Sequence, residues 1–136
     1  MNVAIKVVDR LLIIAHGSFD PTGDEWRTCL DTIEKHGITR TQHLIYTDGG
    51  APTIAQYREL TAVLAGRVVP TAVVFDSLRV RASLAALSLF NSSIKSFPPC
   101  GLADALRFLE VPVSRFDLIT RELQALRHAV AEDYDR

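Results

Sequence analysis

The sequence predicts a single α/β domain with a mixed, mostly parallel sheet of five strands, about four helices and one extra C-terminal helix. Its length of 136 residues fits one domain with one core. Short apolar runs alternate four times with segments of helical periodicity, and this alternation requires a largely parallel sheet with right-handed crossovers. With 48% apolar and 23% charged residues, the composition is that of a folded globular protein rather than a disordered one.

Charge, hydropathy and cysteine content argue against several classes of protein. The sequence has 15 basic and 16 acidic residues, so its net charge is -1. It therefore lacks the excess of positive charge that binding to nucleic acid or an anionic membrane usually requires. The longest clean apolar run, residues 11–15, is far shorter than the roughly 20 residues of a membrane span. No signal peptide is expected at the start, and Cys29 and Cys100 do not make a disulfide framework. We therefore expect a cytoplasmic protein with no nucleic-acid partner and no membrane span.

The first two elements are expected to be strands. Alternate residues from Val3 to Val7 are apolar, as on one buried face of a strand. Residues 11–15 are apolar throughout, which is typical of a central strand covered on both faces. A tight turn at Asp9-Arg10 would make them an antiparallel hairpin, although two-residue turns prefer Gly or Asn.

The first helix has a marked start and end. Thr22 and Glu25 have the spacing of a capping box, and Gly37 can supply a left-handed C-terminal residue. A strand is expected after it, at about residues 38–47. The apolar stripe that we expect this helix to bury consists of Trp26, Cys29, Leu30 and Ile33.

The same pattern then repeats. Thr53 and Gln56 form a second capping box, and Gly66 is expected to stop that helix. The next strand covers about residues 68–75, with Pro70 near its start, where a missing N–H is tolerated.

Two further helices and a short strand complete the predicted domain. We expect a helix over residues 77–90, a strand over residues 94–97 and a helix over residues 101–110. Pro112 then separates off a fifth helix. The chain is accordingly divided into a domain over residues 1–111 and an amphipathic helix over residues 112–136.

The fifth helix carries a narrow apolar seam. Ser114 and Asp117 are expected as its cap and its first-turn acid. Spacings of three and four indicate either packing on the protein's own sheet or pairing with a second copy or another protein. A homodimer would use Phe116, Ile119, Leu123, Leu126 and Val130.

Several segments resemble the STAS domain family, and locally its SpoIIAA-like subgroup. The matching segments are residues 11–17 (LLIIAHG), 45–53 (IYTDGGAPT), 71–77 (TAVVFDS), 94–97 (IKSF) and 103–109 (ADALRFL). The resemblance covers about residues 3–111 and implies a STAS-like fold. It also implies a non-catalytic regulatory or scaffolding module that binds another protein.

The resemblance implies a phosphorylation site as well. In the family's anti-sigma factor antagonists, a Ser or Thr at the start of the second helix is phosphorylated, and Thr53 is the nearest hydroxyl here. Asp76-Ser77 looks more like the family's motif but lies one strand–helix unit later. Both hydroxyls also suit a plain helix-capping role.

Physical reasoning places a binding surface at the same end of the sheet. In an open parallel sheet, ligands bind outside the carboxyl ends of the strands, and helix N-termini there favour anions. Two adjacent glycines let backbone N–H groups approach a neighbour closely. The candidate binding residues are Asp48, Gly49, Gly50, Thr53, Asp76, Ser77 and Arg79.

Two other functions stay open from the sequence. One is a small-ligand binding domain for a lipid or an anionic metabolite, which would show a closed apolar cavity where a scaffold shows filled packing. The other is an enzyme that uses His16 or Cys100, although no catalytic motif is present. We expect His16 to be satisfied by the backbone, and the histidine and cysteine spacing predicts no metal. No cofactor is predicted.

Overall fold

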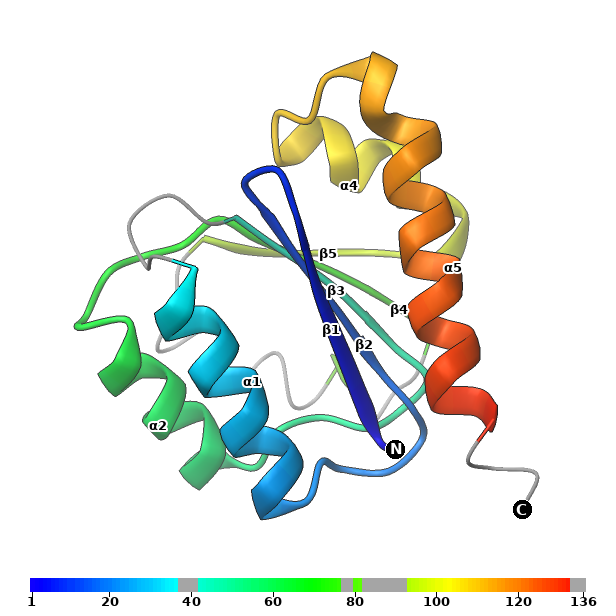
Figure 1. Ribbon diagram of the computed structural model, residues 1–136. Helices are drawn as coiled ribbons and strands as arrows, with labels where there is room; N and C mark the ends of the chain where they lie inside the picture. The colour runs from blue at the N-terminus through cyan, green and yellow to red at the C-terminus, as the bar shows by residue number, and fades with distance from the viewer. Residues whose placement is uncertain (37–41, 77–79, 82–92, 133–136) are drawn as a thin grey trace.

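A five-stranded sheet lies between two layers of helices (Figure 1). The computed structural model describes the chain except for residues 37–41, 77–79, 82–92 and 133–136. The strands are β1 (Val3–Val8), β2 (Leu11–His16), β3 (Gln42–Thr47), β4 (Thr71–Phe75) and β5 (Ile94–Phe97). Their spatial order follows the chain order, with β1 antiparallel to β2 and the other neighbours parallel. The predicted α/β class and its mixed, mostly parallel sheet are confirmed.

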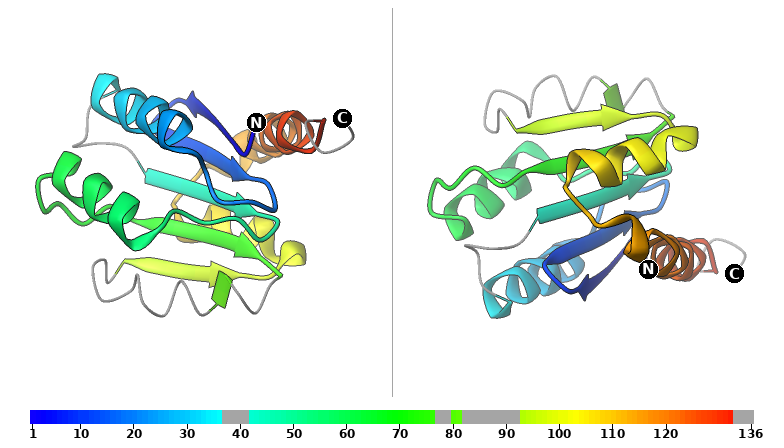
Figure 2. Two further views of the ribbon diagram at one scale, coloured as in Figure 1. Left: turned by 90° about the horizontal axis from the view of Figure 1, so that it is seen from below. Right: turned by 90° about the horizontal axis from the view of Figure 1, so that it is seen from above.

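The helices cover both faces of the sheet (Figure 2). On one face lie α1 (Gly23–Lys35) and α2 (Ile54–Val63), and on the other lie α4 (Leu102–Phe108) and α5 (Phe116–Glu132). Successive residues of a strand point to opposite faces of the sheet, so each face has its own apolar core.

The predicted hairpin of β1 and β2 is present. Val8 pairs with Leu11, so Asp9 and Arg10 form a two-residue turn. Asp9 adopts a φ of 55°, a left-handed conformation that Asp tolerates better than most residues. Arg115 holds the Asp9 carboxylate through Nε and Nη2, at 2.9 and 2.6 Å. The turn thus forms without Gly or Asn.

Both predicted capping boxes are confirmed. The Thr22 hydroxyl accepts from the Glu25 N–H, and the Glu25 carboxylate accepts from the Thr22 N–H. Thr53 and Gln56 make the same pair of bonds at the start of α2. The predicted stripe of α1 is also buried, and it consists of Trp26, Cys29, Leu30 and Ile33.

Several boundaries differ from the sequence prediction. α2 ends at Val63, before Gly66, because Ala65 already takes a left-handed φ of 53°. β4 begins at Thr71, since Val68 is 55% exposed and Pro70 has no N–H to donate to the sheet. β3 begins at Gln42, and the residues expected before it lie outside the described residues.

The later helices begin after short 3₁₀ turns. α4 follows the turn Pro99–Gly101, and α5 follows the turn Val113–Arg115. Ser114 therefore lies inside a turn instead of capping α5, while Asp117 does occupy the first turn of the helix. Most of the helix expected over residues 77–90 lies outside the described residues.

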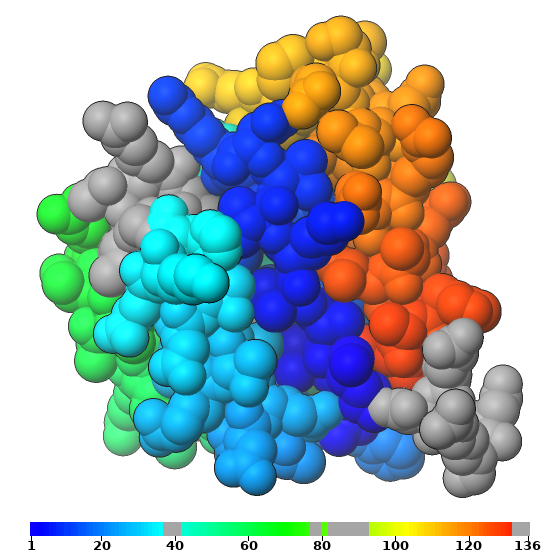
Figure 3. Space-filling view, in the orientation of Figure 1, coloured from blue at the N-terminus to red at the C-terminus, as the bar shows by residue number. Residues whose placement is uncertain are grey.

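The seam of α5 packs on the protein's own sheet. Ile119, Leu123 and Val130 are only 1–2% exposed, and they contact the face of the sheet formed by β1 and β2. Figure 3 shows α5 directly beside β1. Phe116 and Leu126 pack against the same core. Of the two alternatives left by the sequence, the structure has packing within one chain, so a homodimer through these residues would need the helix to leave the sheet.

Candidate functional site

The loop with Asp48, Gly49 and Gly50, which is expected to bind a ligand, is hydrogen-bonded to the loop between β2 and α1. The Gly50 N–H donates to the Gly17 carbonyl at 2.8 Å, and the Asp48 N–H donates to the His16 carbonyl at 3.2 Å. The Gly49 and Ala51 N–H groups also have acceptors within the protein. The close approach that the glycines allow is therefore an approach to the β2–α1 loop.

The remaining residues of the predicted surface are spread apart. Thr53 is exposed and caps α2, whereas the Asp48 carboxylate lies 3.9 Å from the Arg127 guanidinium of α5. Asp76 is exposed at the end of β4. Ser77 and Arg79 lie outside the described residues. The structure thus joins Asp48, Gly49 and Gly50 in one loop, and a binding role for this surface stays a prediction.

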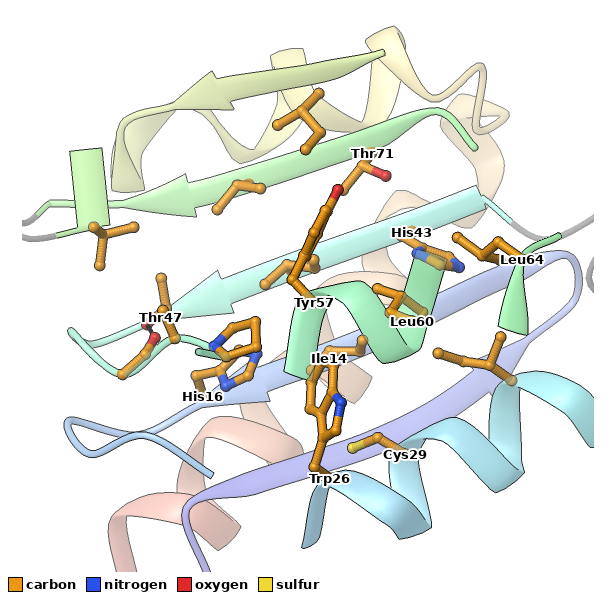
Figure 4. A pocket seen from close by; sticks show the side chains of 18 residues that line it. Ile14, His16, Trp26, Cys29, His43, Thr47, Tyr57, Leu60, Leu64 and Thr71 are labelled. Atoms are coloured by element: carbon orange, nitrogen blue, oxygen red, sulfur yellow. Dashed lines mark hydrogen bonds between the residues drawn. The ribbon is translucent and has the colours of Figure 1, made fainter. Parts of the chain in front are cut away.

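A pocket that the sequence did not predict lies between the sheet and the helices α1 and α2 (Figure 4). We call it the sheet–helix pocket. Its cavity of about 60 Å³ is smaller than the roughly 150 Å³ cavity that accepts benzene. A larger ligand therefore requires side chains to move. The strand residues that line it are Ile14, His16, His43, Ile45, Thr47, Thr71, Val73 and Ile94, and the helices and loops add Trp26, Cys29, Ile33, Gly50, Ala51, Pro52, Tyr57, Leu60, Leu64 and Val80.

Strand register arranges the pocket as an apolar centre with a polar group toward each end. The row formed by Ile14, Ile45 and Val73 crosses the middle. At the carboxyl end of the strands, His16 pairs with Thr47. At the other end, His43 pairs with Thr71 and Leu12. His43 and Thr47 are four positions apart along β3, and Thr47 pairs with His16. The backbones of the two histidines are therefore about 13 Å apart along the strand direction.

Each histidine has a buried nitrogen that lacks a partner among the described residues. His16 is 2% exposed and His43 is 3% exposed. Neither Nδ1 of His16 nor Nε2 of His43 has a hydrogen-bond partner in the part of the chain that the structure describes. Since most buried polar groups are paired, and an unpaired one costs about 1–3 kcal/mol, two in one pocket call for an explanation. The sequence predicts that backbone groups bond to the His16 imidazole. Its Nδ1 has no such partner in the described part of the chain.

Other polar groups around the pocket are already bonded. The Thr47 hydroxyl donates to the Gly50 carbonyl, and the Thr71 hydroxyl donates to the Val69 carbonyl at 2.9 Å. The indole of Trp26 donates to the main-chain carbonyl of Gln56. Free hydrogen-bonding capacity therefore remains at the two imidazoles.

Both imidazoles are neutral at pH 7. Burial lowers the pKa of His16 and of His43 from 6.5 to about 4. Asp20 and Glu25 act in the opposite direction on the pKa of His16, but more weakly than burial. Each neutral ring offers one N–H donor and one nitrogen acceptor.

His16 and Cys100, the two residues that an enzyme was expected to use, do not line the same pocket. Burial, followed by the charge of Glu25, raises the pKa of the Cys29 thiol to about 12, so this thiol is protonated and unreactive. Cys100 is exposed in the turn before α4, away from the pocket lining. His16 and His43 are too far apart to share a metal ion. Within the described residues, no group of three or more His, Cys, Asp or Glu side chains could hold one.

No protein-family model, curated protein or solved structure matches the chain. None of the described helices is long and apolar enough to cross a membrane. A functional interpretation therefore depends on the sheet–helix pocket and its two histidines.

Proposed function

We propose that this protein is a small-ligand-binding module and that the sheet–helix pocket is its binding site. The observation that carries the proposal is the pair of buried imidazole nitrogens without partners on one apolar pocket. A ligand that bonds to one of them would offset the free energy of leaving it unpaired. Between a scaffold with filled packing and a binder with a cavity, the cavity favours the binder.

We further infer that the protein binds without catalysing a reaction. A general base needs a group that orients it, and a nucleophile needs an activating base within hydrogen-bond reach. His16 Nδ1 has no such partner in the described part of the chain, and the Cys29 thiol is held protonated.

A STAS-like regulatory role fits this proposal. The chain-order sheet with four parallel strands supports the family's fold as a hypothesis. Gly50, Ala51 and Pro52 line the pocket and lead directly into Thr53, the exposed cap of α2. A ligand that moves this loop would change the face that a partner protein is proposed to contact. Phosphorylation of Thr53 would act at the same place, because its hydroxyl accepts the capping bond from Gln56.

Titration with the apolar probe 1-chlorobutane tests the proposed binding site. Two-dimensional ¹H–¹⁵N spectra of the full chain should show saturable shifts for the amides of Ile14, Ile45 and Val73. Ile45→Phe fills the pocket and should abolish these shifts. The matched control Ile54→Phe adds the same bulk at an exposed position of α2 and should leave them unchanged. Absence of saturable shifts in the wild type, or their persistence in Ile45→Phe, would overturn the proposal.

A further inference from the structure

Within the described residues, the lining of the sheet–helix pocket carries no charged side chain. Among the lining residues that the structure describes, none is Asp, Glu, Lys or Arg, and both imidazoles are uncharged at pH 7. Burying a charge without a partner is strongly unfavourable. Asp20 and Glu25 lie close enough to act on the pKa of His16, so they would also repel an anion at that end. An anionic metabolite is therefore disfavoured.

The pocket nevertheless favours a polar group on its ligand. The hydroxyls of Thr47 and Thr71 and the indole of Trp26 are bonded within the protein. The free nitrogens of His16 and His43 are buried, and the lining between them is apolar. A hydroxyl can both donate and accept, so it can bond to a neutral imidazole in either tautomer.

We propose that the pocket takes an uncharged, mainly apolar molecule whose hydroxyl or carbonyl group bonds to the free nitrogen of His16 or His43. This inference rests on the proposed binding function and adds the chemical class of the ligand. The two histidines act as specificity residues, because they distinguish a ligand with a hydrogen-bonding group from one without. The cavity of about 60 Å³ selects a small molecule.

A series of four-carbon probes separates charge from hydrogen bonding. We would titrate the full chain at pH 7.5 with 1-butanol, 1-chlorobutane, butanoate and butylammonium and follow the pocket amides by NMR. After correction for their free energies of transfer from water to hydrocarbon, 1-butanol is expected to bind at least about tenfold more tightly than 1-chlorobutane, because a bond to histidine replaces the hydrogen bonds that the hydroxyl loses with water. The two ions are expected not to bind. Equal affinities for 1-butanol and 1-chlorobutane after the same correction for transfer, or saturable binding of butanoate, would overturn the inference.

Two variants test which histidine forms the hydrogen bond to 1-butanol. His16→Phe and His43→Phe keep an aromatic ring but remove the free nitrogen. In at least one of them, the preference for 1-butanol over 1-chlorobutane should fall to about one, while binding of 1-chlorobutane persists. An unchanged preference in both variants would overturn the assignment of the ligand's hydrogen bond to His16 or His43. If a variant does not fold, the ¹⁵N shifts of the wild-type imidazoles, which should move when 1-butanol is added, decide the question.

The probe titrations distinguish a wrong ligand class from a wrong binding function. If 1-chlorobutane binds in the pocket but 1-butanol has no advantage, the binding function stands and the ligand class is wrong. If no probe gives saturable shifts of the pocket amides, both are wrong.

Discussion

The indole Nε1 of Trp26 donates a 2.9 Å hydrogen bond to the main-chain carbonyl of Gln56, and this bond joins α1 to α2. The Gln56 side chain adds a second link, because its Nε2 donates to the carbonyl of Pro21, just before α1. Trp26 also lines the sheet–helix pocket. The two helices therefore cover the pocket as one connected layer.

Trp26→Phe should weaken this layer. The substitution removes the indole donor to the Gln56 carbonyl and part of a buried ring. The free energy of unfolding should fall by about 2 kcal/mol, as measured by urea denaturation. Gln56→Ala serves as a comparison, since it removes the link to Pro21 and the capping bond from the Thr53 N–H but keeps the carbonyl, and its effect should be smaller. A Trp26→Phe protein as stable as the wild type would show that the bond does not stabilise the layer.

Gly50→Ala should be strongly destabilising. A Cβ at this position would overlap the carbonyl oxygen of Phe19 and lie 2.8 Å from that of Gly17, so the two loops would have to separate. Overpacking of this kind costs about 3 kcal/mol in the free energy of unfolding.

Gly23→Ala is the matched control for this substitution. A Cβ at Gly23, the first residue of α1, meets nothing within 4 Å, and Ala favours helix more than Gly does. Its thermal midpoint should be equal to or above that of the wild type. Similar losses in the two variants would contradict the assigned role of Gly50.

Stability should fall as the pH falls from about 6.5 to about 4. In the unfolded chain a histidine has a pKa near 6.5, whereas burial lowers the pKa of His16 and of His43 to about 4 in the folded state. Between these values the unfolded state binds more protons, so acid favours unfolding. The loss is at most about 3 kcal/mol for each histidine.

Urea midpoints measured between pH 4 and pH 7.5 check this dependence. His16→Phe and His43→Phe should each flatten the curve and raise stability at pH 7, since each removes an unpaired buried nitrogen. His36→Gln removes an exposed histidine at the end of α1 and should leave the slope in place. A flat wild-type curve would mean that the pocket histidines have partners or are not buried.

Local signals in the sequence were sufficient for most elements of the fold. The caps at Thr22 and Thr53 were predictable because the bonding groups lie three residues apart in the chain. Ser114 was misassigned because a 3₁₀ turn and a helix start have similar local sequences. The seam of α5 has the same periodicity whether it packs on its own sheet or on another protein, so its location needed the tertiary structure.

The sheet–helix pocket could not be predicted in the same way. His16 and His43 are on neighbouring strands, and only the register of β2 against β3 places both on the face that α1 and α2 cover. The one local signal was a histidine at an inward position of each apolar strand. Gly50 was identified as a point of close approach, but the approaching group, the Phe19 carbonyl, belongs to a loop distant in sequence.

Removing α5 should prevent the rest of the chain from folding stably. The helix buries Ile119, Leu123 and Val130 on β1 and β2, and it forms the ion pair between Glu122 and Lys6 at 2.6 Å. A chain ending at Glu110 should expose this apolar face, lose its cooperative urea transition and aggregate. A cooperative monomer from that chain would show instead that the seam belongs to an interface between molecules.

Leu123→Ala tests the same contact in the full chain. The leucine is 2% exposed, so the substitution leaves a cavity and should lower the free energy of unfolding by about 3 kcal/mol. Leu118→Ala removes the same atoms from a half-buried position of α5 outside the seam, and its effect should be clearly smaller. The loss at Leu123 should also be independent of protein concentration, because the contact lies within one chain. A loss that grows on dilution would place the seam between two chains.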